Sequence, residues 1–583
     1  MTKTKGGDLI ADHLIRSGMP YVFGICGHGN VGMLDALFDR RDQITLVSPR
    51  HEQTAGHMAD AYYRVSHQPV ATLTSCGPGS ANIPMALACA QADSSAFLAI
   101  TANVPTSQFN RAPFQETYMH NQASFPEAVR PFVKRSFQPT RVEMLPLALR
   151  QATNLLTSGR PGPVNLDVPY NLFQEEAEMT AEPMDRAGVD NRPGGSLEAV
   201  AAVVDLLLGA AAPLLFVGHG VTLSEAGAEL TVASPSGMGT LDMTDPLALG
   251  FIGRNGTYTA NQAGRHADVL LVVGARFDDR SASSWKQGYS WNIPPTTLIH
   301  VDIDPSEIGR NYEPHIGIQA DARTFLRQLL AEIERRGVSR HEGTREWLSR
   351  IAGWRAEWDA FIAPNFEIDT APMRPERVVA DIRQVAPDDT ILVPDSGSHH
   401  NWFMQFWECR RPQSMLNTWG YSAMGFGVSG VLGAKLAAPD RPCIAVVGDG
   451  GFTMTPHVLC TAVEYNIPAI WVVWNNYAWG AIRDLQQGTF GGREIGTSFT
   501  HGPNAEPYNP DFAALARAHG VDGVKVSRSG DFRDALKRAV ASGKPCLIDL
   551  EVAPGVKPPS TGSWQLPPMP APEPAFGSPW SPV

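Results

Sequence analysis

Residues 446–480 read VVGDGGFTMTPHVLCTAVEYNIPAIWVVWNNYAWG, and this stretch decides the fold class. Two apolar runs, Cys443–Val447 and Ala469–Trp474, predict buried strands of a parallel sheet, because strands covered on both faces lack polar alternation. Between them, Thr455 is expected to cap a helix whose first turn contains a proline. A strand, a helix and a strand in this order form one α/β unit. Both strands then end at the same edge of the sheet, where open α/β sheets bind ligands.

The residues that follow the two strands indicate a site for a divalent metal and a phosphate. Gly450 and Gly451 are small enough for backbone amides to approach a phosphate, and Asp449 beside them supplies a carboxylate for a hard cation. Asn476 adds an amide oxygen after the second strand. One acid and one amide carry too little charge for Mg²⁺ alone, so phosphate oxygens, water and the backbone carbonyl near Ala478 would complete the shell. Taken alone, the glycine-rich tetrapeptide also fits an ordinary tight turn.

The spacing of these residues resembles a known signature. GDG, 24 intervening residues and NN resemble the thiamin diphosphate motif of the acetolactate synthase and pyruvate oxidase superfamily. The resemblance extends over roughly positions 5 to 555. It implies that thiamin diphosphate and Mg²⁺ are bound, with Asp449, Asn476 and Ala478 at the metal and with Gly450, Gly451 and Ala478 at the cofactor.

A second segment carries the acid that such a cofactor requires. Residues 50–60 read RHEQTAGHMAD and resemble the acetolactate synthase segment RHEQGAGHMAEGY. The resemblance implies that Glu52 bonds N1′ of the aminopyrimidine and favours the imino tautomer, whose nitrogen takes the proton from C2 of the thiazolium. Without these flanking residues, a helical glutamate would be interpreted as a solvated surface charge.

Three loops of the N-terminal part also bear comparison with the family. Residues 74–79, TSCGPG, resemble its TSGPG loop, and residues 114–116 match its FQE segment, which places Gln115 among the catalytic residues. The third loop departs from the family, because residues 26–30 read CGHGN where acetolactate synthases have PGG. Similar GH loops occur in cyclohexane-1,2-dione hydrolase and in the inositol-pathway trihydroxycyclohexanedione hydrolase. His28 would then face the thiazolium and protonate the substrate, or it only orders the loop.

Two segments of the C-terminal part resemble the family's cofactor-binding motifs. Residues 395–402, DSGSHHNW, resemble DVGQHQMW, and residues 422–427, SAMGFG, resemble GTMGFG. The resemblance implies cofactor contacts from Gly397, Ser398, His399, Ser422 and Met424. Met424 would be the apolar side chain that holds thiamin in a bent conformation. The bend brings the amino nitrogen of thiamin close to its C2 atom, and this proximity favours the proton transfer. A methionine beside glycines is otherwise ordinary core filler.

Strand-like runs fall into three groups, which predicts an α/β protein with three doubly wound parallel-sheet domains. Residues 1–185 would form the pyrimidine-binding domain, 195–340 a central domain and 370–555 the domain that binds the diphosphate and Mg²⁺. The remaining residues, 556–583, are rich in proline. They would form a tail that dangles or lies across the surface as a lid.

The central domain raises the question of a second cofactor. Residues 274–280, GARFDDR, resemble the GVRFDDR of acetolactate synthases, where the arginine at the position of Arg276 helps to hold FAD. Asp302 falls where that family contacts the flavin dinucleotide. Related enzymes use this domain for the ADP part of coenzyme A or leave it empty. A loop arginine paired with Asp278 or Asp279 explains Arg276 nearly as well.

The resemblance implies a thiamin diphosphate-dependent C–C bond lyase or carboligase, of the lyase or transferase class, that acts on a small 2-oxo acid or acyloin-type carbonyl substrate. Acetolactate synthases place a tryptophan nine residues past the second Asn, and this chain has Leu485 there. The substrate therefore stays open, with a 2-hydroxyacyl-CoA lyase, a cyclic 1,2-dione hydrolase and a flavin-dependent pyruvate oxidase-type oxidoreductase as alternatives. A non-catalytic paralogue is disfavoured because Glu52, Asp449 and Asn476 are present. Two chains build each site in this superfamily, which implies a homodimer or homotetramer with shared active sites.

Composition and sequence pattern argue against a nucleic-acid-binding protein, a membrane-spanning protein and a disulfide-bonded protein. The formal net charge is −12, which offers no basic patch for nucleic acid. The longest apolar stretch, Ala199–Val217, is interrupted by Asp205 and Pro213, which predicts a helix followed by a strand and no membrane span. Seven cysteines without a CxxC pair predict reduced thiols, and no amino-terminal signal is recognisable, so a cytoplasmic protein is expected.

Overall fold

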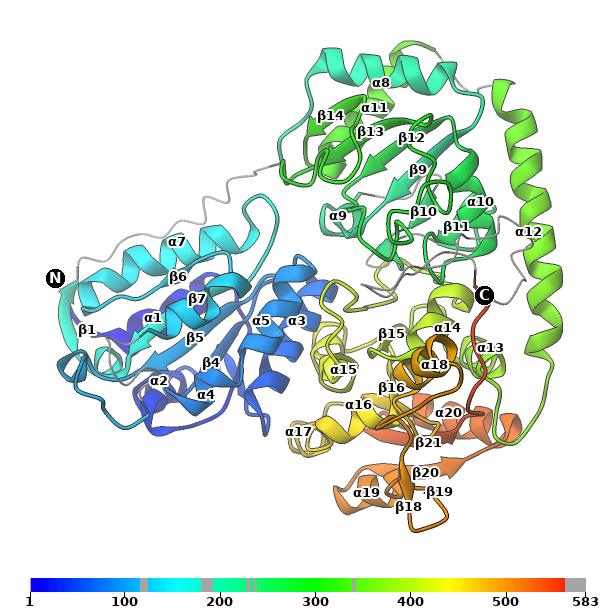
Figure 1. Cartoon of the computed structure of the whole chain (residues 1–583). Coiled ribbons are helices and arrows are strands. Elements are labelled where there is room, and N and C mark those ends of the chain that lie inside the picture. The colour runs from blue at the N-terminus through cyan, green and yellow to red at the C-terminus, as the bar shows by residue number, and fades with distance from the viewer. Residues whose placement is uncertain are drawn as a thin grey trace.

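The computed structural model describes residues 2–115, 124–179, 192–226, 231–233, 237–240, 242–337 and 342–560. These residues form three α/β units, each built on a parallel sheet flanked by helices (Figure 1). The predicted fold class is confirmed. Glu116 of the FQE segment and the tail beyond residue 560 lie outside the described residues.

The N-terminal unit contains a six-stranded parallel sheet in the order β3-β2-β4-β5-β7-β6. Its strands are β2 (Tyr21–Gly24), β3 (Thr45–Val47), β4 (Ala71–Thr74), β5 (Leu98–Asn103), β6 (Ser136–Phe137) and β7 (Val164–Pro169). Its helices are α1 (Gly6–Arg16), α2 (Val31–Phe38), α3 (Glu52–Ser66), α4 (Pro78–Ala81), α5 (Pro84–Ala92), α6 (Phe125–Val129) and α7 (Leu145–Thr157). An antiparallel ribbon of β1 (Thr2–Lys5) and β8 (Glu176–Met179) joins its two ends. Since β2 pairs with β4, the loops 26–30 and 74–79 leave the sheet side by side.

The central unit has a parallel sheet in the order β11-β10-β9-β12-β13-β14. Its strands are β9 (Pro213–Val217), β10 (Thr231–Ala233), β11 (Ala248–Phe251), β12 (Val269–Val273), β13 (Thr297–Asp302) and β14 (Ile316–Gln319). Its helices are α8 (Leu197–Gly209), α9 (His219–Leu223), α10 (Tyr258–His266) and α11 (Ala322–Arg335). The helix and strand predicted in the longest apolar stretch are therefore confirmed as α8 and β9. Among the described helices, none combines the length and apolarity that a membrane span needs.

Helix α12 (Arg345–Phe366) leads to the C-terminal unit, whose five-stranded parallel sheet has the order β15-β16-β17-β21-β20. Its strands are β15 (Ile391–Pro394), β16 (Cys443–Gly448), β17 (Ile470–Asn475), β20 (Asp522–Val526) and β21 (Cys546–Glu551). Its helices are α13 (Pro375–Val385), α14 (Ser398–Phe406), α15 (Phe426–Ala437), α16 (Asp449–Met454), α17 (Val458–Glu464), α18 (Gly480–Thr489), α19 (Phe512–Ala518) and α20 (Ser529–Ser542). A small hairpin, β18 (Thr500–His501) and β19 (Glu506–Pro507), follows α18. The two strands predicted around the signature are confirmed as β16 and β17, which are parallel neighbours.

The helix predicted between these two strands is present as α17, but it begins later than predicted, and a further short helix precedes it. Helix α16 begins at Asp449, directly after β16, and Thr455 interrupts the helical path with φ −139° and ψ 46°. A second helix, α17, begins only at Val458 with His457 as its N-cap. The proline after Thr455 disfavours the helical conformation of the residue before it, so α16 ends there. Asp449 therefore lies in the first turn of a helix.

The N-terminal and C-terminal units of the chain pack together through α3 and α15, which lie side by side in Figure 1. Glycines permit the close approach, since a Cβ on Gly433 would lie 2.0 Å from the Met58 carbonyl oxygen and one on Gly430 would lie 3.2 Å from the Ala61 Cβ. Met58, Ala61 and Phe426 belong to one continuous hydrophobic core that spans both units. This contact fixes the first turn of α3 relative to the C-terminal unit.

Candidate active site

The Asp449 carboxylate lies in the space between the ends of β16 and β17 and is 1% exposed. Its Oδ1 accepts the Gly450 amide at 2.8 Å, and its Oδ2 accepts the amides of Asn476 at 3.2 Å and Ala478 at 3.3 Å. Burial raises the pKa of Asp449 to about 6, although these hydrogen bonds oppose the shift. The first turn of α16 and the loop after β17 therefore meet at one acid. Such a meeting point suits a cation with its phosphate ligands.

Asn509 also contacts this acid, and the sequence had given no signal for it. Its Nδ2 donates to Asp449 Oδ2 at 2.9 Å and to Asn475 Oδ1 at 2.8 Å. Among the described residues, no group of three or more His, Cys, Asp or Glu side chains is placed to hold a metal ion. A cation at Asp449 would thus need oxygen ligands from a bound phosphate and from backbone, as the sequence predicted.

A cradle for an anionic group faces the same edge of the sheet. It is formed by Gly397 and by the first turn of α14, which contains Ser398 and His399. A Cβ on Gly397 would lie 2.5 Å from the His399 ring, and a Cβ on Gly480 would lie 3.0 Å from Ser398 Oγ and 2.7 Å from Asn476 Nδ2. Because these Cβ atoms are absent, Ser398 can lie next to the loop that follows β17.

His399 supplies the observation that best fits a missing ligand. Its side chain is 1% exposed, and its Nε2 has no hydrogen-bond partner among the described residues. Burial lowers the pKa of His399 to about 4, so the ring is neutral near pH 7. A buried polar atom without a partner is uncommon and points to a group that binds there. The cradle residues and Asp449 together fit a magnesium diphosphate.

The segment with Met424 is anchored by Asp395 at the end of β15. Both oxygens of the Asp395 carboxylate accept the Gly425 amide, at 3.0 and 2.9 Å, and Oδ1 also accepts the Gly427 amide at 3.1 Å. Burial raises the pKa of Asp395 to about 6. Ser422 Oγ lies 2.9 Å from the Ser396 hydroxyl. Met424 sits between these anchors and is 37% exposed, so an apolar side chain projects from a rigid segment.

Glu52 is the first residue of α3 and is only 8% exposed. Its Oε2 accepts a hydrogen bond from Asn82 Nδ2 at 2.9 Å, and Gly79 leaves the space for Oε1. Asn82 was not predicted, because nothing in its local sequence indicates this long-range contact. The next residue, Gln53, reaches toward Gly425 of the C-terminal unit, with its Nε2 3.7 Å from an ideal Cβ there. Between described residues, no hydrogen bond joins Glu52 to Asp449 within this chain.

His28, Cys76 and Gln115 come together at the carboxyl edge of the N-terminal sheet. Cys76 Sγ lies 3.6 Å from His28 Nε2 and 3.8 Å from Gln115 Oε1. The His28 ring also contacts Phe114 and Tyr170, each at 5.8 Å between ring centroids. A cavity of about 320 Å³ opens beside His28. The three predicted loops thus form one cluster, and its thiol is the member whose role the sequence did not indicate.

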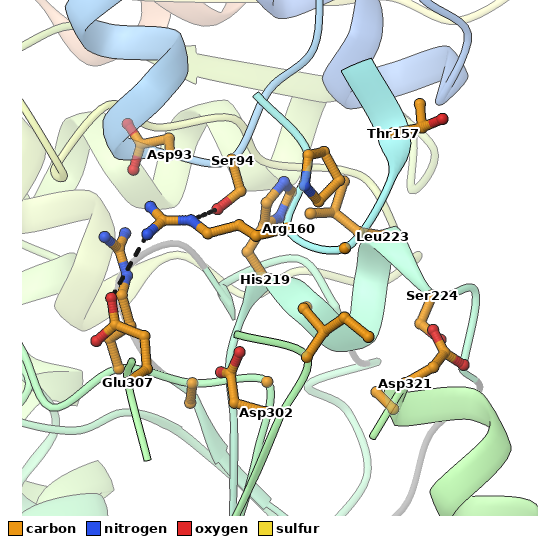
Figure 2. A pocket seen from close by; sticks show the side chains of 18 of the residues that line it. Asp93, Ser94, Thr157, Arg160, His219, Leu223, Ser224, Asp302, Glu307 and Asp321 are labelled. Carbon is orange, nitrogen blue, oxygen red and sulfur yellow. Dashed lines mark hydrogen bonds and ion pairs between the residues drawn. The ribbon is translucent and has the colours of Figure 1, made fainter. Parts of the chain in front are cut away.

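A larger cavity, of about 400 Å³, lies between the N-terminal and central units (Figure 2). Arg160 crosses it, with Nε 2.8 Å from Ser94 Oγ and with Nη1 3.5 Å from Glu307 Oε1. Asp302 closes the end of β13 at its wall, and burial raises the pKa of Asp302 to about 6. Arg276 also lines this cavity.

Among the described residues, Arg276 forms its hydrogen bond with a backbone carbonyl and not with the acids of the GARFDDR segment. Its Nη2 donates to the Ala92 carbonyl of the N-terminal unit at 2.7 Å. The Asp278 carboxylate bonds Ser281, and the Asp279 carboxylate pairs with Arg254 at 2.5 Å. Arg276 therefore faces the cavity wall, and Asp279 has a different arginine as its partner.

Sequence models of the thiamine pyrophosphate enzymes match all three units. The N-terminal TPP binding domain matches residues 4–125, the central domain residues 200–329 and the C-terminal TPP binding domain residues 395–550. The chain is similar to the "Probable acetolactate synthase large subunit" of Methanocaldococcus jannaschii, with 31% identity over 94% of this chain and 92% of that protein. It is also similar to the acetolactate synthase large subunit of Parasynechococcus marenigrum, with 31% identity over 98% and 92%. The isozyme 3 large subunit of Escherichia coli is 29% identical over 95% of each chain.

Proposed function

The chain belongs to the family of thiamine pyrophosphate enzymes, and we propose that it is an acetolactate synthase-like carboligase or lyase that acts on a small 2-oxo acid. The observation that carries the proposal is the convergence of Asp449 with the cradle around His399, whose buried Nε2 is free to meet a ligand. This convergence occurs in a chain that matches relatives named acetolactate synthase large subunit over nearly its full length.

The C-terminal unit would hold the charged end of the cofactor. Asp449, the Asn476 side chain and the Ala478 carbonyl would bind Mg²⁺, while the amides of Gly450 and Gly451 would meet the diphosphate. Ser398 and His399 from the first turn of α14 complete the cradle. Bound thiamin diphosphate supplies an electron sink for breaking and forming C–C bonds next to a carbonyl. The protein's part is to fix that group and to move protons around it.

Glu52 would hold a proton at the pyrimidine ring nitrogen, as the family pattern implies. Burial and the Asn82 hydrogen bond keep its carboxyl in one rotamer, which a proton transfer over a short distance requires. His28 would move a proton at the substrate oxygen, and its contact with Cys76 orients the ring toward one side. Gln115 would support this end of the site through the same thiol.

Two chains would share each active site. Glu52 forms its hydrogen bond within the N-terminal unit, and exposed apolar side chains lie on segments of both units near the site. These side chains are Met85, Phe114, Met424 and Met454, of which Phe114 is 78% exposed. A second copy of the chain would cover them and bring its Glu52 to this Asp449, in a homodimer or homotetramer.

Mixing two inactive variants tests the shared site. Glu52→Ala and Asp449→Ala are each expected to be inactive, whereas a mixed dimer contains one intact site of two. About half of the dimers in a random equimolar mixture are mixed, so the mixture should regain about a quarter of wild-type activity. Mixed dimers that form, by native mass spectrometry, and stay inactive would refute the sharing.

The central cavity would hold the adenine nucleotide part of FAD. Its volume of about 400 Å³ lies within the range of cofactor sites. Asp302, at the end of a parallel strand, is placed to accept ribose hydroxyls, and Arg160 and Arg276 are placed to meet phosphates. A flavin absorption band in the purified protein would support FAD. A colourless and fully active protein would refute FAD, and binding of an acyl-CoA ester would then assign the cavity to coenzyme A.

The cytoplasm is the proposed location, because all seven cysteines are free thiols in the structure. The substrate is tested by incubating the protein, thiamin diphosphate and Mg²⁺ with 2-oxo acids, cyclic diones, sulfoacetaldehyde and 2-hydroxyacyl-CoA esters, followed by mass spectrometry. The proposal expects turnover of a 2-oxo acid. Turnover confined to a dione or a CoA ester would overturn the substrate class but retain the cofactor.

A further inference from the structure

A loop that follows α18 crosses the proposed metal site. Trp479 N donates to the Thr497 carbonyl and Phe499 N donates to the Tyr477 carbonyl, both at 2.8 Å. The loop then turns back through β18 and β19 and reaches Asn509. We call residues 497–509 the metal-site hairpin. It forms hydrogen bonds with the residues on both sides of Ala478, and these bonds fix its position relative to the loop that follows β17.

Asn509 brings the end of this hairpin into the site. Its Nδ2 donates to two oxygens, Asp449 Oδ2 and Asn475 Oδ1, and this choice of partners fixes which way the amide faces. Asn475 is itself held, because its Nδ2 donates to Asp549 Oδ1 at 2.9 Å. Asp549 is fully buried. A chain of hydrogen bonds from the sheet interior therefore orients Asn509.

The two oxygens of Asp449 are in different surroundings. Oδ2 accepts three N–H groups, from Asn476, Ala478 and Asn509, and the shortest of these bonds comes from Asn509. A carboxylate oxygen with three donors has no room for a cation in the plane of its lone pairs. Oδ1 accepts the Gly450 amide at 2.8 Å and is the oxygen with room for a cation.

We propose, on the basis of the proposed thiamin diphosphate and Mg²⁺ site, that Asn509 is a positioning residue for the cation. Its amide bonds Oδ2 of the Asp449 carboxylate, which would leave Oδ1 for the metal. The affinity of the site for the metal would then depend on the position of the metal-site hairpin, which carries Asn509. Hydrogen-bond partners of a ligating carboxylate commonly set metal affinity in this way. Asn509 donates to Oδ2 and would act on the cation only through the Asp449 carboxylate.

The test measures the affinity for Mn²⁺, as a probe for Mg²⁺, by electron paramagnetic resonance of the full-length protein in a fixed excess of thiamin diphosphate. Asn509→Asp keeps the volume of the side chain but removes both N–H donors, and Asn509→Ala removes the side chain. Both are expected to weaken Mn²⁺ binding by about 10- to 100-fold. Asn504→Ala is the matched control, because Asn504 is exposed at the turn of the same hairpin and should change nothing.

A second readout separates positioning from general damage. Hydrogen exchange of the metal-site hairpin should slow when Mn²⁺ and thiamin diphosphate bind to the wild type, and this slowing should be lost in Asn509→Asp. Excess Mn²⁺ should restore activity to that variant. Should Asn509→Ala fail to fold by circular dichroism, Asn509→Asp carries the same expectation.

The outcomes distinguish this inference from the proposed function. A wild-type protein that binds no Mn²⁺ in the presence of thiamin diphosphate would overturn both. Wild-type binding together with an unchanged affinity in Asn509→Asp would overturn only the role of Asn509.

Discussion

Arg64 joins the N-terminal and C-terminal units, and its replacement is expected to destabilise the protein strongly. Its guanidinium bonds Asp60 at 2.7 and 3.0 Å and Asp93 at 3.3 Å, and both carboxylates are fully buried. It also donates to the Asn417 carbonyl of the C-terminal unit. Its Cζ lies 5.0 Å from the centre of the Phe426 ring in α15. One side chain thus pairs with two buried acids and contacts both α3 and α15.

The substitution Arg64→Met keeps the apolar bulk and removes the counter-ion of both acids. Breaking a buried ion pair by removing one partner costs about 3–5 kcal/mol of folding free energy. Arg50→Met is the matched control, because Arg50 pairs with Glu464 across the same two units at 2.6 Å. Those side chains are 47% and 44% exposed. Loss of such an exposed pair costs less than about 1 kcal/mol.

Heat-denaturation midpoints of the wild type, the two single variants and the double variant Arg64→Met, Asp60→Asn form the assay. We expect a large decrease for Arg64→Met, a small one for Arg50→Met, and partial recovery when Asp60 loses its charge. An equal decrease for the two arginine variants would refute the argument that burial makes the Arg64 network important.

Three further predictions concern the helix contact, acid stability and the proton donor. Gly433→Ala would place a Cβ 2.0 Å from the Met58 carbonyl and should lower the denaturation midpoint, whereas Gly353→Ala, with open space around it, should leave the midpoint equal or higher. Burial lowers the pKa of His57 from 6.5 to about 3, so between these values the unfolded chain binds a proton that the native chain does not. The contribution of His57 to stability should therefore fall as pH drops from 6.5 to 4, so His57→Gln should lose less stability than the wild type over this pH range. His28→Ala should cut turnover by about 10²-fold or more and leave the affinity for thiamin diphosphate intact, measured by kinetics and calorimetry. Unchanged turnover would reduce His28 to a loop-ordering residue.

The sequence was sufficient where the signal is local. Uninterrupted apolar runs predicted β16 and β17, and both strands lie within one or two residues of their expected ends. The order of these elements then placed Asp449 and Asn476 at one sheet edge, where the structure has them in hydrogen-bond contact. The short helix α16 was not predicted, and α17 begins at Val458 instead of directly after Thr455.

The sequence was insufficient where a contact depends on tertiary packing. Asn82 and Asn509 are polar residues at the ends of short elements, as many surface asparagines are, and only the fold brings them to Glu52 and Asp449. The pairing of Arg276 with the Ala92 carbonyl likewise joins two units that are far apart in the chain. Local patterns identify the acids of the site, but the residues that orient those acids come from distant segments.

The most direct measurement is calorimetry of thiamin diphosphate binding to the wild type, Asp449→Ala and Glu52→Gln, with and without Mg²⁺. We expect saturable binding that requires Mg²⁺ in the wild type, its loss in Asp449→Ala, and retained binding without turnover in Glu52→Gln. A wild type that takes up no thiamin diphosphate, or an Asp449→Ala variant that binds it as tightly as the wild type in Mg²⁺, would rule out the proposed cofactor site.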